Sequence, residues 1–280
     1  MIERLLCNEV LRDLEFAAQC DLAASLGYDG LEIAPFTLGD EPHRLPDATV
    51  ERVRRDAADA GIGVVSLHWL LTAPEGLSIT TADPAIRQRT LDVMRGLIDL
   101  CAGLGGRVLV HGSPKQRALD PSDPEGDAAR GREAFATIAP HAEAAGVTYC
   151  IEPLSTRETR FINTVAEAAE LVDEIDSPAV RTMVDCRAAR ISEPDTPVEA
   201  LLDRWLPAGM IRHVHLNDQN RHGPGQGDDP FAGVLDALRR HHYAGAVSVE
   251  PFVYEPDGPT TAARAIGYLQ GLEEALAWRA

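Results

Sequence analysis

The chain has 280 residues, which suits one large barrel domain or two modest domains. Apolar residues make up 45% of it and charged residues 25%, as in globular proteins that bury a core. The 44 acidic residues outnumber the 26 basic ones and give a formal net charge of −18. Such a charge repels phosphate backbones and anionic lipids, so we expect no nucleic-acid partner and no membrane association.

The five cysteines are widely spaced and form no C-x-x-C motif, which disfavours a disulfide framework and a zinc knuckle. Met1 leads into no long apolar segment, and no part of the sequence approaches the roughly 18–20 apolar residues that a membrane helix needs. We therefore expect a cytoplasmic protein with reduced thiols.

Short apolar segments alternate with longer amphipathic segments from one end of the chain to the other. The apolar segments predict strands at residues 4–8, 30–34, 63–68, 107–111, 148–152, 181–185, 211–216 and 246–250. Apolar spacing of three to four residues predicts helices at 11–26, 49–60, 85–104, 128–145, 165–175, 198–205, 231–241 and 262–277. Gly27 and Gly61 are expected just past helix ends, and Asn163 or Thr164 is expected to cap the next helix start.

Eight strand–helix units account for the whole sequence, so we predict an α/β fold, a single-domain (β/α)8 TIM barrel over residues 1–280. An open doubly wound sheet is disfavoured, because no G-x-G-x-x-G follows a predicted strand and no Walker A motif is present. The longer loops, at 72–83, 113–127 and 217–230, all follow strands. That end of a barrel is where active sites form.

The last four predicted strands each carry, at their C-terminal end, a polar residue that can bind a metal. These residues are Glu152, Asp185, His215 and Glu250, and successive members lie 33, 30 and 35 residues apart, about one strand–helix unit each. Side by side on one rim, three ionised carboxylates need a positive countercharge. Oxygen ligands with a single imidazole favour one divalent cation, Mn²⁺ first with Mg²⁺ or Co²⁺ as alternatives, over a thiolate zinc site.

Other polar residues lie on the same predicted strands. His213 is two residues before His215 on the same face, so we expect it deeper in the barrel as a supporting residue. His68 and His111 end two earlier strands, where each is expected either to contact the substrate or to be a structural histidine. Glu32 ends another strand, and we expect it to be structural.

With these residues the chain resembles the sugar phosphate isomerase/epimerase family of xylose-isomerase-like TIM barrels, most of all the ketose 3-epimerases of the D-tagatose 3-epimerase type. The matching strings, within about residues 147–252, are Ile151-Glu152-Pro153, His213-Val214-His215-Leu216, Gly223-Pro224-Gly225-Gln226-Gly227 and Val249-Glu250-Pro251-Phe252. The resemblance implies that Glu152, Asp185, His215 and Glu250 bind the metal. It also implies that Glu158 and Arg221 contact substrate hydroxyls.

One position departs from the family pattern. On the sixth strand that pattern is Asp-x-x-His, whose histidine contacts the substrate, and this chain has Asp185-Cys186-Arg187-Ala188. The metal ligands are unaffected, but one substrate contact is missing or is supplied by another group, such as His68 or His111.

The site predicts a divalent-metal-dependent isomerase or epimerase that acts on a non-phosphorylated ketose or keto-sugar. Metal chelation of a carbonyl and a neighbouring hydroxyl would stabilise an enediolate. Glu152 and Glu250 would serve as the acid/base pair, one removing the proton and the other returning it on the opposite face. The same enediolate permits aldose–ketose isomerisation or β-elimination by a lyase acting on a 3-keto-glycoside, so both remain alternatives.

Other classes of function are also compatible with parts of the sequence. A non-catalytic barrel subunit remains open, and turnover by the purified protein would exclude it. The net charge and the missing strand-six histidine disfavour an abasic-site endonuclease. Lys115, the only lysine, is the single candidate for Schiff-base chemistry, but its predicted loop position favours a solvated or substrate-contacting role. We expect a small-molecule sugar as the partner, and a homo-oligomer is compatible with the fold.

Overall fold

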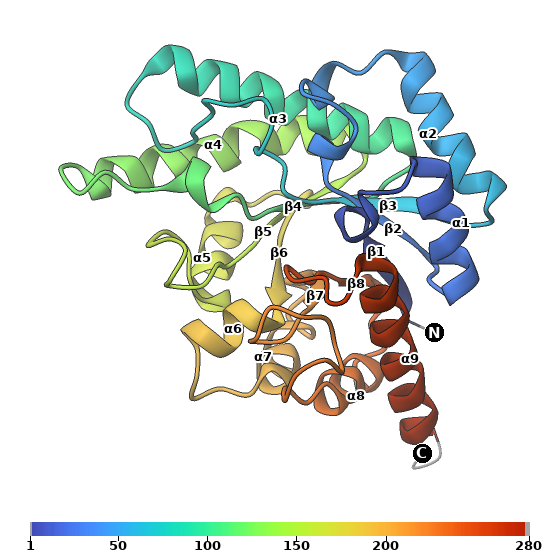
Figure 1. The fold of residues 1–280 in the computed structure, drawn as a ribbon. Helices are drawn as coiled ribbons and strands as arrows, with labels where there is room; N and C mark the ends of the chain where they lie inside the picture. Colours follow the sequence, from blue (N-terminus) through green and yellow to red (C-terminus); the bar gives the residue numbers. More distant parts are fainter. Residues whose placement is uncertain (1, 278–280) are drawn as a thin grey trace.

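The computed structural model describes residues 2–277, which form a closed barrel of eight parallel strands surrounded by helices (Figure 1). Neighbouring strands follow chain order, and β1 completes the barrel by pairing with both β2 and β8. The strands are β1 (Glu3–Cys7), β2 (Gly30–Ile33), β3 (Gly63–Leu67), β4 (Val108–His111), β5 (Thr148–Ile151), β6 (Val180–Asp185), β7 (Ile211–Leu216) and β8 (Ala246–Val249). The predicted TIM barrel is therefore confirmed, and every strand boundary lies within one residue of its prediction.

Helices cover the outside of the barrel, and α9 closes their ring by packing against both α8 and α1 (Figure 1). Within the described residues they are α1 (Phe16–Leu26), α2 (Asp47–Asp59), α3 (Pro84–Leu104), α4 (Pro124–Ala145), α5 (Val165–Ile175), α6 (Cys186–Ser192), α7 (Val198–Trp205), α8 (Ala232–Arg240) and α9 (Gly258–Ala277). Eight of these correspond to the predicted helices, and α6 was not predicted.

The first predicted helix begins later than expected. It starts at Phe16 rather than at residue 11, because Asn8–Leu11 forms a separate 3-10 turn, η1. The side chain of Asn8 joins this turn to α1 and to the residue after β2, since it donates to Gln19 at 3.1 Å and accepts from the Ala34 amide at 2.8 Å.

Helix α6 follows β6 without an intervening loop. Asp185 is both the last residue of β6 and the N-cap of α6, since its Oδ1 accepts from the Ala188 amide at 2.6 Å. The strand therefore ends at Asp185 as predicted, and the chain continues at once into a helix that the sequence did not predict. An N-cap carboxylate stabilises the free amides of the first helical turn, and here the same contact fixes the direction of the Asp185 side chain.

The other helix-end predictions are confirmed. Thr164 caps α5 in a capping box with Glu167, in which each side chain accepts from the backbone of the other. Gly27 and Gly61 follow α1 and α2 with φ of 93° and 80°, a left-handed conformation that glycine adopts without steric cost.

The barrel interior changes from apolar to polar along the strand direction. Val108, Val110, Cys150 and Met183 form a buried apolar cluster inside the barrel. Continuing with the same alternation along β5 and β6, the next inward positions are Glu152 and Asp185. The polar layer thus lies at the C-terminal ends of the strands, on top of this packed apolar cluster.

Two further expectations can be compared with residues 2–277. The five cysteines are all free and buried, so none forms a disulfide. None of the described helices combines the length and the apolar character that crossing a lipid bilayer demands.

Candidate metal and substrate site

Four side chains at the C-terminal ends of β5 to β8 converge on one point. Glu152, Asp185, His215 and Glu250 each direct one ligand atom into the cluster, and these atoms all lie within 4.8 Å of one another. From Nδ1 of His215 the distances are 3.0 Å to Glu250 Oε2, 3.6 Å to Glu152 Oε1 and 3.8 Å to Asp185 Oδ2. All four residues are buried. The predicted metal-ligand set is thus brought together in space.

Glu32 contacts the His215 imidazole at the ring nitrogen opposite the carboxylate cluster. Its Nε2 lies 3.4 Å from Glu32 Oε1, while Glu32 Oε2 lies 2.9 Å from Nε2 of His213. Ser248 Oγ lies 3.0 Å from the same nitrogen of His213. Among the residues described, Nδ1 of His215 makes no hydrogen bond of good geometry, although Glu250 Oε2 lies 3.0 Å away. This buried nitrogen faces the three carboxylates, which is the arrangement expected of a histidine that binds a metal.

Two other groups in the barrel also contain several ligand-type atoms. One is Glu32, His213 and His215, and the other is Cys7, His68 and His215. Their atoms are largely engaged with one another or with Glu9 and Glu250. Only the cluster of Glu152, Asp185, Glu250 and Nδ1 of His215 offers four ligands next to a cavity, so it is the favoured cation site in the described residues.

The pKa shifts reflect the burial and crowding of the carboxyl groups in this cluster. Burial raises the pKa of Asp185 to about 7 and raises that of Glu152, and the neighbouring carboxylates add to both shifts. Burial also opposes the ionised form of Glu250, but His215 and His68 outweigh it and hold its pKa well below the usual range. Two carboxyls thus resist ionisation in this apolar surrounding. A divalent cation would supply the missing countercharge.

The structure adds two residues that the sequence did not single out. Asn217 donates to Asp185 Oδ2 at 2.6 Å and to Glu250 Oε2 at 3.2 Å, and so holds two of the carboxylates. Arg117 is fully buried, and its Nη2 donates to the main-chain oxygen of Glu152 at 2.7 Å. Asn217 could have been found, because it lies two residues after His215 and so faces the same way. Arg117 gives no such signal, because it ends a short 3-10 turn, Pro114–Arg117, whose sequence shows no strand alternation.

His68 and His111 do not line the cavity, so of the two roles expected for each the structure favours the structural one. His68 is buried between two carboxylates. Its Nδ1 lies 3.0 Å from Glu250 Oε1, and its Nε2 lies 3.0 Å from Glu9 Oε2. His111 faces outward, toward the helices, with Nδ1 2.7 Å from the Tyr149 hydroxyl and its ring against Phe135. Val108 and Val110 take the inward positions of β4, so alternation turns His111 away from the barrel interior.

A cavity of ≈ 630 Å³ opens above the cluster. Its floor contains Glu152, Asp185 and Glu250, and its wall includes Trp69, Gly112, Lys115, Glu158, Arg187, Ala188, Arg221 and Phe252. The indole nitrogen of Trp69 donates to Glu250 Oε1 at 3.1 Å, so the aromatic wall is joined directly to the floor. This space is large enough for a monosaccharide or a small glycoside.

The two residues expected at substrate hydroxyls, Glu158 and Arg221, both lie on the wall of this cavity. Oε1 of Glu158 lies 3.5 Å from Nη1 of Arg187, and its other oxygen accepts from Ser155. The guanidinium of Arg221 lies over the Phe252 ring, 5.8 Å from its centroid. Ala188, in the first turn of α6, presents only a methyl group to the same space.

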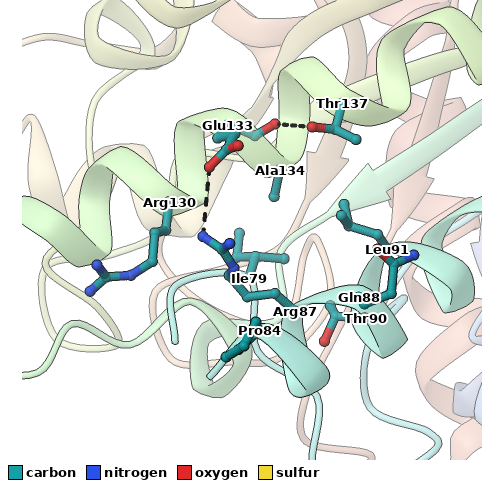
Figure 2. Close-up of a pocket in the computed structure, with 10 residues that line it drawn as sticks. All are labelled: Ile79, Pro84, Arg87, Gln88, Thr90, Leu91, Arg130, Glu133, Ala134 and Thr137. Atoms are coloured by element: carbon teal, nitrogen blue, oxygen red, sulfur yellow. Dashed lines mark hydrogen bonds and ion pairs between the residues drawn. The ribbon is translucent and has the colours of Figure 1, made fainter. Parts of the chain in front are cut away.

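A second cavity lies between α3 and α4, away from the carboxylate cluster. Its volume is ≈ 190 Å³, and Figure 2 shows Arg87 and Glu133 facing one another across it, with 3.6 Å between Nη1 and Oε2. None of the four clustered ligands contributes to its lining. We therefore place the candidate chemistry in the larger cavity at the barrel mouth.

Comparisons with known proteins identify relatives that are named as epimerases. The chain is 31% identical to a D-psicose 3-epimerase of Agrobacterium fabrum over 244 residues, covering 85% of this chain and 80% of that protein. It is 29% identical to a 3-dehydro-D-guloside 4-epimerase of Escherichia coli, covering 90% and 89% of the two chains. A crystal structure of D-psicose 3-epimerase in the presence of D-fructose superposes with a TM-score of 0.81 at 23% identity, covering 97% and 99%.

The family model described as "Xylose isomerase-like TIM barrel" matches residues 20–272, which is most of the described chain. The matched range includes all four clustered ligands and the cavity above them. The chain therefore belongs to the family of xylose isomerase-like TIM barrels, and it is an enzyme of the isomerase and epimerase class.

Proposed function

We propose that this protein is a divalent-metal-dependent epimerase of non-phosphorylated ketoses or keto-sugars, which moves a proton next to a substrate carbonyl. The observation that carries the proposal is the convergence of three carboxylates and Nδ1 of His215 at the floor of a sugar-sized cavity. The names of the curated relatives, which are ketose 3-epimerases and a 4-epimerase of a keto-glycoside, support the same class of reaction.

The residues present fit a hard divalent cation. Glu152, Asp185, His215 and Glu250 would hold it, and we propose Mn²⁺, with Mg²⁺ or Co²⁺ as alternatives, from three oxygen donors and one imidazole. When bound, the cation would supply Lewis acidity that polarises the substrate carbonyl and lowers the energy of an enediolate. With the cation bound, Glu32 would hold the remaining proton of His215 on Nε2, so that Nδ1 can serve as the ligand.

Glu152 and Glu250 are the proposed acid/base pair, and their surroundings differ. Oε1 of Glu250 accepts from both His68 and Trp69, so that oxygen is held in place by two donors. The Glu152 carboxylate receives no such side-chain donor besides His215 within the described chain, and burial raises its pKa. A carboxylate with a raised pKa is the stronger base, so we propose that Glu152 removes the carbon-bound proton. Glu250 would return a proton, received from the imidazole of His68 at its Oε1, on the other face and invert the centre, and Glu152 would release its proton to solvent.

The test is metal-dependent exchange of carbon-bound hydrogen in D2O, followed by NMR with free ketoses, aldoses and 3-keto-glycosides. We expect exchange at a carbon next to the carbonyl, which disappears in Glu152→Gln and Glu250→Gln while metal remains bound. Near-normal exchange in the Glu152→Gln protein would exclude this mechanism. Turnover by the purified protein alone would also exclude a non-catalytic barrel subunit.

A second candidate reaction is supported by one comparison and one residue. The Escherichia coli relative is named as a 4-epimerase of 3-dehydro-D-guloside, and Ala188 leaves open space beside the site in this chain. A 3-keto-glycoside could then enter, followed either by epimerisation or by β-elimination of its aglycone. In the same NMR experiment, exchange at C4 without product release would indicate the epimerase. Release of the aglycone would indicate the lyase.

Two further parts of the proposal concern the setting of the enzyme. We propose that it works in the cytoplasm on a small sugar, and that a homo-oligomer is compatible with its fold. Cell fractionation and light scattering of the purified protein would test these two statements separately.

A further inference from the structure

The cavity wall carries an arginine that the acid/base chemistry does not use. Arg187 lies in the first turn of α6, and its amide donates to Asn217 Oδ1 at 2.9 Å. Its guanidinium lies over the Phe252 ring, 5.6 Å from the centroid. Among the described residues its buried Nε has no hydrogen-bond partner. The side chain is thus held in place while part of its hydrogen-bonding capacity is unused.

A second guanidinium shares the same aromatic ring. Arg221 lies 5.8 Å from the Phe252 centroid, within the range of a cation–π contact. Its backbone has a φ of 75°, and its carbonyl accepts from the amides of Phe252 and Val253 at 2.8 and 3.0 Å. These bonds tie the loop after β7 to the loop after β8. Two like charges are therefore fixed beside one ring before any substrate binds.

Lys115 adds a third positive charge to the wall. It is the only lysine of a chain whose net charge is −18, and it lines this cavity. Across residues 2–277, neither Lys115 nor Arg221 forms an ion pair, although several surface arginines do. In a protein with surplus carboxylates, unpaired cations gathered in one cavity indicate an anionic ligand.

The negative charges of the cavity leave room for this ligand. At the floor, Glu152, Asp185 and Glu250 carry three negative charges, of which the proposed divalent cation would offset two. On the wall, Glu158 lies beside Arg187 and Glu75 is exposed at the rim. The wall itself thus carries three cations and two carboxylates, and Lys115 and Arg221 have no ion-pair partner among the described residues. A substrate carboxylate would supply that partner.

We propose that the substrate carries a carboxylate in addition to its hydroxy-ketone, as in a keto-uronic acid or a glycoside of one. Arg187 would pair with the carboxylate through its guanidinium, and Arg221 and Lys115 would add attraction from the same wall. A planar guanidinium fork matches a carboxylate in shape as well as in charge. The small side chain of Ala188 leaves space in the cavity between the carboxylate cluster and Arg187. This inference rests on the proposed function, because it names the substrate of that same site.

The experiment compares a neutral ketose with its acidic counterpart. Metal-loaded protein is incubated in D2O with D-fructose, with D-fructuronate, which differs by a carboxylate at C6, and with fructose 6-phosphate. We expect kcat/KM for exchange at least tenfold higher for the uronate, through a lower KM, and a ratio that shrinks as NaCl is added. In Arg187→Gln the uronate-to-ketose ratio should fall toward one.

Matched variants distinguish the loss of a cavity charge from a loss of folding. Arg204→Gln removes an arginine that also stacks on an aromatic ring, that of Trp205 at 4.4 Å, but outside the cavity, so it should keep the ratio. If Arg187→Gln does not fold, Lys115→Gln is measured in its place, and the uronate KM should rise there too. Equal efficiency with ketose and uronate, or preference for the phosphate ester, would overturn this inference and leave the proposed epimerase standing. Exchange with no keto-sugar at all would overturn both.

Discussion

Glu32 and His215 lie 3.4 Å apart inside the barrel, with a carboxylate oxygen facing Nε2 of the imidazole. Because Glu32 comes from β2 and His215 from β7, this contact reaches across the barrel rather than along neighbouring strands. It leaves Nδ1 as the nitrogen that can face the three carboxylates. Burial opposes protonation of His215, but Glu250 and Glu32 raise its pKa well above the usual value. Glu32 thus orients His215, and Glu152, Asp185 and Glu250 form the candidate metal site with it.

Glu32→Gln should weaken metal binding while the barrel still folds. The amide has no net charge, so it neither fixes the His215 tautomer nor increases its basicity. We expect Mn²⁺ affinity to fall by roughly 10–100-fold, measured by competition with a chelator. Ser248→Ala is the matched control, since Ser248 contacts His213 but neither His215 nor the cluster. Equal losses in the two variants would refute a specific role for Glu32.

Gly112→Ala should displace the proposed base without removing it. A Cβ atom at Gly112 would lie 2.2 Å from Oε2 of Glu152, so the carboxylate would have to move. A displacement of about 1 Å costs on the order of 100-fold in rate, and we expect that loss in exchange kcat/KM with a nearly unchanged Tm. Gly63→Ala is the control, because nothing lies within 4 Å of its added carbon. An active Gly112→Ala enzyme would contradict the proposed position of the base.

Metal affinity should depend on pH through Asp185. Burial and the charges of Glu152 and Glu250 raise its pKa to about 7, so below that pH the carboxyl of the metal-free protein holds a proton. A cation must displace this proton, and its affinity therefore falls as pH drops from 8 to 6, by up to about tenfold per pH unit on the acid side. Chelator competition at pH 6, 7 and 8 measures this slope. Asp185→Asn should bind more weakly at every pH and lose the Asp185 contribution to the slope.

His68 and His111 should behave differently when replaced by leucine. His68→Leu leaves Glu9 and Glu250 buried without their shared partner, which typically costs 3–5 kcal/mol for a broken buried pair. His111→Leu leaves only the Tyr149 hydroxyl unpaired, at a cost of about 1–3 kcal/mol. We expect metal affinity and kcat to fall in the first variant alone. Urea unfolding and exchange kinetics test both, and a raised KM in His111→Leu would restore it as a substrate contact.

Much of the fold follows from the sequence because parallel barrel strands are apolar on both faces and each is followed by an amphipathic helix. The strand ends were predictable for the same reason, and so was the meeting of Glu152 with Asp185, since successive strands are neighbours. Helix α6 was not predictable from periodicity, because seven residues directly after a strand carry too little pattern. Its start depends on the Asp185 cap, a contact that exists only in three dimensions.

Contacts between elements distant in the chain were the hardest to predict. His68 follows a strand as a substrate contact would, but Glu9 flanks it from η1 and Glu250 from just after β8, and no local pattern gives that pairing. Arg117 ends a short 3-10 turn after β4 and reaches the main chain of Glu152 only in the folded state. His111 is a different case, because the alternation of Val108 and Val110 on β4 already predicts that it faces outward.

The pairing of β1 with β8 has a consequence for the order of events during synthesis. Glu3 lies beside Ala246 in the finished barrel, so β1, which is synthesised first, can pair with β8 only after β8 has left the ribosome. Glu250 follows directly after β8, and its hydrogen-bond partner His68 lies in the N-terminal half of the sequence. A nascent chain therefore lacks a complete set of ligands until translation is nearly over. Cation capture by this cluster would mark the end of folding, and it would stabilise only chains that have closed the barrel.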